Sequence, residues 1–190
     1  MWSTIHFRAM RFTGTRLSRG LLLSAAIALP TVGVASSAAQ VAVTDLHGKQ
    51  CHSVASSSRG STRECAGVRG YALLVYDDDD RTSIDVIAPK GAVYPLLFWD
   101  VVTPGYAVIG QKAEWLLGTR KGRPAPTALT VRLTRLDLHD TRDLIAVARI
   151  DGDGACVVFK ADAAAPGADE RAARAARNHA SKCLGAWQEE

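Results

Sequence analysis

The feature that most restricts the fold of this chain is a series of short apolar segments separated by strong turn signals, from residue 70 to residue 161. Residues 70–76 are rich in β-forming side chains, and residues 82–88 alternate apolar and polar side chains over most of their length. Four consecutive aspartates, residues 77–80, separate the two segments. An antiparallel hairpin over residues 70–89 is therefore the first element that we predict.

Similar segments continue the pattern and predict an antiparallel meander of about seven strands. Pro89 and Gly91 suit a type I turn, residues 151–154 favour a hairpin turn, and Pro95 places its strand at an edge or a bulge. Residues 118–126 have the composition of a loop. The remaining strands are predicted at residues 92–99, 106–109, 112–117, 127–138 (with a bulge or the strand's end near Arg135), 144–150 and 155–161.

The first 39 residues have the pattern of a secretory signal peptide. Four arginines and no acidic residue precede an apolar run at residues 21–34, which small residues follow. Cleavage is expected at or next to Gln40, and either Met1 or Met10 is the initiator. An uncleaved membrane anchor is the alternative, since the apolar run is almost long enough to span a bilayer.

Removal of this segment changes the charge balance and excludes one class of partner. The chain has 23 basic and 19 acidic residues, and the four arginines before Gln40 leave 19 of each. The basic isoelectric point of the chain is therefore due to the arginines of the signal. A neutral domain gives no reason to predict binding to nucleic acid, and the longest strongly apolar stretch after residue 40 is too short to span a membrane.

Four cysteines follow the signal, and an even number in an exported chain predicts two disulfides. Three pairings are possible. We favour Cys51 with Cys65 and Cys156 with Cys183, because each closes a local loop and ties an end segment to the β-rich body.

The domain is predicted to be one folded unit, residues 40–190, with two distinct end segments. Residues 40–69 are polar and read as a loop region pinned by the first disulfide, apart from a short possible strand at residues 41–43. After Pro166, acidic residues precede basic ones, as a helix dipole prefers. Small residues recur there at helical spacing: Ala168, Ala172, Ala175, Ala176 and Ala180. The expected fold is thus mainly β with a C-terminal helix, an antiparallel sandwich or partly open barrel.

The acidic turns invite a calcium interpretation, because hard cations bind several carboxylate oxygens. The next ligand and glycine positions of an EF-hand loop are, however, filled by unsuitable residues. They are Arg81 and Thr82 after residues 77–80, and Ala155 and Cys156 after Asp151 and Asp153. We predict two polar turns and no metal or cofactor; a shared cation site would require the fold to bring both turns together.

Catalytic arrangements are weak in this sequence, and we predict that the protein is not an enzyme. Cys51 and His52 could be combined with a distant histidine and aspartate, or with Cys65 around zinc, but an oxidised cysteine is no nucleophile and the spacing is not that of a zinc site. A small hydrolase remains the alternative. Its available bases are His47, His52, His139 and His179.

The leading hypothesis is an exported binding module of the bacterial envelope, in the periplasm or secreted, whose ligand is a protein or a glycan. Arginines and aromatic residues are favoured at binding surfaces. The candidate binding residues are Trp99, Tyr106, Arg120, Lys121 and Arg123. A purely structural envelope component is a further alternative.

Overall fold

We analysed a computed structural model of the chain, which describes residues 40–79, 81–138 and 140–185. The predicted signal at residues 1–39 lies outside these ranges, as do Asp80 and His139. Within the described ranges, no helix is long and apolar enough to cross a membrane.

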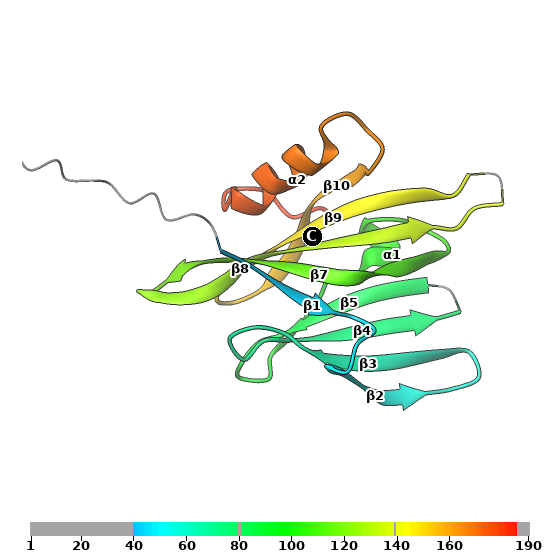
Figure 1. Ribbon diagram of the computed structural model, residues 1–190, viewed down its shortest axis with the longest axis horizontal. Coiled ribbons are helices and arrows are strands. Elements are labelled where there is room, and N and C mark those ends of the chain that lie inside the picture. The colour runs from blue at the N-terminus through cyan, green and yellow to red at the C-terminus, as the bar shows by residue number, and fades with distance from the viewer. Residues whose placement is uncertain (1–39, 80, 139, 186–190) are drawn as a thin grey trace, which may run out of the picture. The chain divides into compact units, whose positions relative to one another are not determined.

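The described residues form ten strands in two antiparallel sheets (Figure 1). Sheet A has the strand order β1-β7-β8-β9-β10, with bounds Gln40–Asp45, Ala107–Arg120, Arg123–Arg135, Arg142–Ile150 and Ala155–Asp162. Sheet B has the order β2-β3-β4-β5-β6, with bounds Cys51–Ser56, Gly60–Ala66, Ala72–Asp78, Arg81–Ile87 and Val93–Pro95. Two helices complete the described chain, α1 (Phe98–Val101) and α2 (Ala168–Arg177).

The inner faces of the two sheets share one hydrophobic core. Trp115 of sheet A is its largest fully buried side chain. The sheets are not closed into a barrel, so of the two predicted architectures the sandwich is the one present. The mainly β fold with a C-terminal helix is confirmed. Sheet B and α1 contribute to this core through Leu73, Val75, Ile84, Val86 and Phe98, and sheet A through Leu129, Val131, Leu133 and Ile150.

Helix α2 covers the outer face of sheet A, opposite sheet B (Figure 1). It buries Ala168, Ala172 and Ala176 against β8, β9 and β10, as the alanine spacing predicted. The helix ends at Arg177, so Ala180 lies beyond it. Alanine side chains allow a close approach but bury little apolar area, and the helix therefore depends on its neighbours for stability.

Both predicted disulfides are present, Cys51–Cys65 and Cys156–Cys183. The first joins directly paired residues of β2 and β3. The second fixes the segment after α2 to β10, where the backbone N–H of Leu184 also donates to the carbonyl of Val157 (2.7 Å). Two predicted turns are confirmed as well: Gly91 N–H donates to the Ala88 carbonyl (2.8 Å), and Asp151 N–H donates to the Gly154 carbonyl (2.9 Å).

The loop predicted for most of residues 40–69 is wrong, although the short strand predicted at residues 41–43 is present as part of β1. This region holds β1, β2 and β3, which bring the strands of the described residues to ten, whereas residues 72–162 contain seven. β2 is exposed along almost its whole length, so its sequence needs no apolar face. Its backbone is paired by β3, which in turn pairs with the apolar β4. Strand identity here comes from the neighbouring strand rather than from local hydrophobicity.

The loop predicted for residues 118–126 is also wrong, because β7 and β8 form one long hairpin. The connection contains only Lys121 and Gly122, both with positive φ (49° and 74°), as two-residue hairpin turns require. The separate strands predicted at residues 106–109 and 112–117 are one strand, β7, whose register shifts between Ile109 and Ala113. β8 ends at Arg135, where the alternation of apolar residues changes phase.

The strand predicted for residues 92–99 ends early, at Pro95. Leu97 then adopts a left-handed conformation (φ 50°) and α1 begins. The stretch is apolar because Leu96 and Phe98 both enter the core, one on each side of this turn. An apolar run alone does not distinguish a strand from a buried turn and helix.

Candidate functional site

The predicted binding residues lie at opposite ends of β7. Tyr106 precedes the strand, and Trp99 of α1 lies at the same end, beside Pro104 and Gly105. Arg120, Lys121 and Arg123 lie at the far end, 14 residues along the strand, or roughly 45 Å away. The structure therefore places Trp99 and Tyr106 at the same end of the sandwich and the three basic residues at the other end.

Arg120 is engaged within the fold. Its guanidinium donates to the Tyr71 hydroxyl (3.1 Å) and to the carbonyls of Pro126 (2.9 Å) and Ile150 (2.8 Å). These contacts tie the end of the β7–β8 hairpin to β9 and to the segment before β4. Lys121 and Arg123 are exposed. Sequence patterns do not reveal this difference, because Arg120 meets its partners only through the tertiary fold.

Two shallow hollows adjoin at the Trp99 end of the sandwich. One, of about 300 Å³, is lined by Asp78, Arg81, Trp99, Asp100, Pro104 and Gly105. The other, of about 290 Å³, is lined by Ala55, Ser56, Ser57, Gly60, Ser61, Thr62, Tyr76, Asp77 and Asp78. Asp78 borders both, so they form one surface, which we call the Asp78 surface. Sequence reasoning found Trp99 but not the neighbours that the β4–β5 turn supplies.

Hydrogen bonds from two strands hold Trp99 in place. Phe98 N–H donates to the Ser83 hydroxyl of β5 (3.0 Å), and Leu96 N–H donates to the Ile84 carbonyl (3.1 Å). At the other end of α1, the Lys160 ammonium of β10 donates to the carbonyl of Val101 (2.7 Å). These bonds and the burial of Phe98 offset the unfavourable backbone of Leu97. A one-turn helix thus presents its tryptophan on a fixed support.

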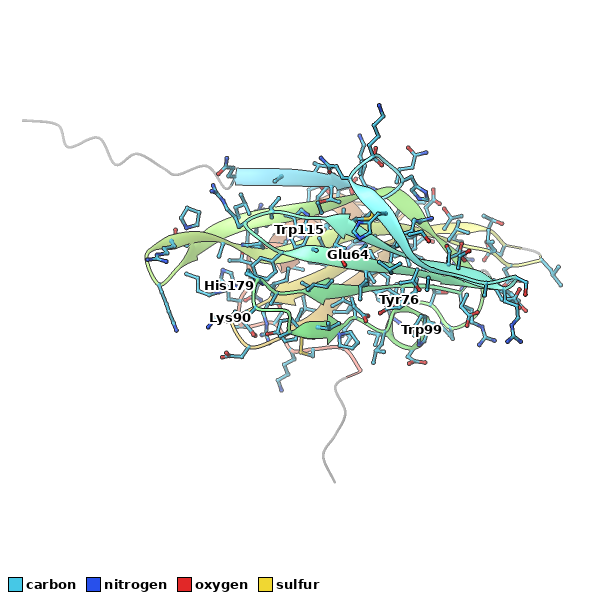
Figure 2. All side chains as sticks on the ribbon, turned by 90° about the horizontal axis from the view of Figure 1, so that it is seen from below. Glu64, Tyr76, Lys90, Trp99, Trp115 and His179 are labelled. Carbon is cyan, nitrogen blue, oxygen red and sulfur yellow. A yellow bond between two sulfur atoms is a disulfide. The ribbon has the colours of Figure 1, made fainter. Side chains whose placement is uncertain are left out.

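Charge on the Asp78 surface is predominantly negative. Three carboxylates, those of Asp77, Asp78 and Asp100, line the two hollows together with one guanidinium, that of Arg81. Two aromatic side chains, Tyr76 and Trp99, complete the lining, and both lie toward the same end of the view in Figure 2. The arrangement offers aromatic faces beside hydrogen-bond acceptors, and it favours ligands with N–H or O–H donors.

Tyr76 and Asp85 form a hydrogen-bonded pair on the outer face of sheet B. The Tyr76 hydroxyl donates to Asp85 Oδ2 across the strand pair (2.9 Å). Burial, the hydrogen bond and the negative charge of Asp85 raise the pKa of Tyr76 to about 12. Burial also raises the pKa of Asp85, against the lowering effect of the bond from Tyr76. The pair fixes the Tyr76 ring at the edge of the Asp78 surface.

These two shifts predict a pH dependence of stability. The folded state holds the Tyr76 proton more tightly than the unfolded chain, so its contribution is complete below pH ~10 and is lost as the pH rises through about 12. The contribution of Asp85 is likewise complete below its unfolded pKa, ~3.9, and is lost as the pH rises through its higher folded pKa. Urea unfolding across both ranges measures these losses.

Tyr76→Phe is expected to abolish the loss of stability at alkaline pH, and Asp85→Asn the loss at acidic pH. Each loss is measured as a change with pH in the difference between the unfolding free energies of the wild type and the variant. A wild-type stability that ran parallel to that of both variants over both pH ranges would contradict the assigned pair.

The two acidic turns lie at opposite ends of the sandwich. Asp78 and Asp79 lie at the Trp99 end, whereas residues 151–154 lie beside Arg120, which bonds the Ile150 carbonyl. A cation site shared between the turns is therefore ruled out by the topology. Among the described residues, no group of three or more histidine, cysteine, aspartate or glutamate side chains is placed to hold a metal ion.

The structure places the described histidines of the hydrolase hypothesis on different elements. His47 lies in the β1–β2 connection and His52 on the exposed strand β2, opposite Glu64. His179 follows α2, where its carbonyl accepts a bond from Arg149 of sheet A. His139 is outside the described residues. Of the three described histidines, none lines a hollow of the Asp78 surface.

A larger groove, of about 580 Å³, lies between α2 and the irregular part of β7. Gly110, Gln111 and Lys112, where the register of β7 shifts, form one side. Arg132 and Asp169 form an ion pair at its margin (2.5 Å). No aromatic side chain is among the lining residues, and the paired charges satisfy one another. A further hollow, of about 480 Å³, lies beside Cys156–Cys183 and is bordered by Leu97, Val101 and Leu184.

Comparisons with known proteins do not assign a family: no family model, no curated protein and no solved structure matches this chain. Function is therefore argued from the surface itself.

Proposed function

We propose that the protein is an exported binding module that holds an amino-sugar-containing glycan on the Asp78 surface. The single observation behind this proposal is the pair of adjoining hollows, with Trp99 in one, Tyr76 in the other and Asp78 shared. Aromatic rings pack against the apolar faces of sugar rings, while carboxylates accept bonds from hydroxyl, amide or ammonium groups.

The shape of the surface supports a chain rather than a compact small molecule. Each hollow is at the lower end of the volumes found for ligand pockets. Two of them in series suit successive units of a polymer lying across the end of the sandwich. The excess of carboxylates favours a sugar with a nitrogen donor over one that carries an acid group.

Export to the periplasm or the cell exterior is part of the same proposal. Its support is the signal-like pattern of the first 39 residues and the presence of two disulfides, which persist in oxidising compartments. A glycan outside the cytoplasm would be accessible to a protein in either location.

Isothermal titration with two hexasaccharides tests the proposal. One probe is the hexamer of glucosamine and the other its N-acetylated form, of equal length but neutral. We expect the cationic hexamer to bind with a Kd on the order of 0.1 mM, and the neutral one more weakly. Added salt is expected to weaken only the binding of the cationic probe, since screening acts on the carboxylates.

Two variants and one control locate the binding. Trp99→Ala is expected to abolish binding of both hexamers, and Asp78→Asn to weaken chiefly that of the cationic one. Asp153→Asn, an exposed aspartate in the turn at the opposite end, is the matched control and leaves both unchanged. Absence of binding by either hexamer, or equal effects of Asp78→Asn and Asp153→Asn, would refute the proposed site.

A further inference from the structure

The sandwich has four edge strands, and three of them carry features that prevent pairing with another chain. β2 has a register shift between Ser53 and Ala55. β6 has three residues and ends in Pro95. β10 is lined by the segment after α2, through the Leu184 N–H and the Cys156–Cys183 disulfide. These are the devices by which sheet edges avoid aggregation.

β1 has none of these features. Its six residues pair with β7 in an unbroken register from Gln40 to Asp45. Residues 40–44 contain no charge and no proline. Among the described residues, β1 pairs with β7 alone, so its other edge offers backbone donors and acceptors. In Figure 2 the strand lies at the margin of the molecule.

The solvent-facing side chains of β1 include two exposed valines beside the unpaired edge. Val41 is 56% exposed and Val43 is 51% exposed, which is unusual for side chains of this kind in consecutive outward positions. Val41 lies directly across from Leu116 of β7 on the same face. An unprotected edge beside exposed valines is suited to strand addition.

We propose that β1 pairs antiparallel with β1 of a second copy of this chain, which joins the two A sheets across a two-fold axis. One register keeps all four valines in contact. With Ala42 on the axis, Val41 of each copy lies opposite Val43 of the other, and the outward row reads Leu116, Val41, Val43 of the second copy. If the two-fold axis instead passes through Val41 or Val43, only one pair of valines lies directly opposite.

Charge agrees with this register. Asp45 is the only ionised side chain of β1, and with Ala42 on the axis the Asp45 of one copy lies beyond Gln40 of the other. The two aspartates are therefore at opposite ends of the paired strands and do not repel one another. Five residues a side bury less than the ~1,200 Å² of a stable complex, so the dimer forms in a concentration-dependent equilibrium.

Sedimentation velocity of the protein, in the form that it is purified after any processing of its N-terminus, tests this pairing. Between ~10 and ~500 µM we expect a monomer–dimer equilibrium with a Kd on the order of 0.1 mM. Val43→Lys is expected to raise that Kd at least ~10-fold, since a charge on the edge opposes pairing. Val54→Lys is the matched control, because Val54 is also an exposed edge valine (48%), on the shifted strand β2.

Cross-linking tests the register without depending on the lysine variants. A mixture of Val41→Cys and Val43→Cys proteins is expected to form disulfide-linked dimers faster than either protein alone. A protein that stays monomeric at ~500 µM, a Kd raised equally by Val43→Lys and Val54→Lys, or cross-linking no faster in the mixture would overturn the proposal.

Discussion

Replacement of Trp115 by alanine is expected to lower the free energy of unfolding by about 4 kcal/mol. Trp115 is fully buried between the sheets and packs 6.3 Å from the Tyr71 ring, centroid to centroid. Its removal leaves a large cavity in a closely packed core. Gly67, which lies against the indole, has no side chain that could fill the space.

Part of that loss comes from a hydrogen-bond chain that joins three strands. Trp115 Nε1–H donates to Thr44 Oγ1 (2.9 Å), and the Thr44 hydroxyl donates to the Ala66 carbonyl (3.1 Å). Both side chains are buried, so Thr44→Val leaves the indole N–H without its acceptor. We expect that change alone to cost about 2 kcal/mol.

Urea unfolding followed by circular dichroism, with both disulfides intact, gives these values. Trp99→Ala is the matched control, because Trp99 is partly exposed at a hollow and its loss is expected to cost no more than about 1 kcal/mol. The description of the core would be contradicted if Trp115→Ala were no more destabilising than Trp99→Ala.

Removal of the Cys156–Cys183 disulfide by alanine at both positions is expected to cost about 3.5 kcal/mol. The bond closes a loop with a sequence separation of 27 and holds residues 178–185 against sheet A. Arg149 donates to the carbonyls of His179 (3.1 Å) and Ser181 (2.8 Å) in the same segment. Helix α2 precedes this segment and buries mainly alanines, so it is the element expected to open first.

The same double replacement of Cys51 and Cys65 is the matched comparison. These two cysteines have a sequence separation of 14. The chain-entropy model therefore predicts that removing their bond costs about 0.5 kcal/mol less stability than removing Cys156–Cys183. Native-state hydrogen exchange separates the two local effects. Loss of Cys156–Cys183 should expose amides of α2, and loss of Cys51–Cys65 those of β2; unchanged protection of α2 in the first variant would argue against its dependence on the bond.

Much of the fold could be predicted because its strongest signals are local. The disulfide pairing followed from loop length, and the turns at Gly91 and Asp151 from residue types that suit only a few backbone conformations. The C-terminal helix followed from alanines at helical spacing. In each of these cases, the residues that decide the structure are close in the sequence.

The errors arose where distant segments decide the structure. β2 is a strand because β3 pairs with it, although its own side chains are exposed. The basic segment at residues 118–126 continues two long strands, although its glycines and prolines suit a loop. Trp99 was predicted at a binding surface, but its neighbours Asp78 and Arg81 come from a turn that local patterns describe only as polar. No sequence spacing records that proximity.

The long-range pairing of β1 has a consequence for the order of folding. Sheet B joins each strand to the next one in the chain, and so does sheet A from β7 to β10. Among the described strands, only β1 pairs with a strand distant in the chain: Thr44 and Trp115 are separated by 71 positions. Closing so large a loop is slow compared with forming local hairpins. We expect pulse-labelled amides of β1 to gain protection last, so the described strand that is synthesised earliest is the last to enter the native structure.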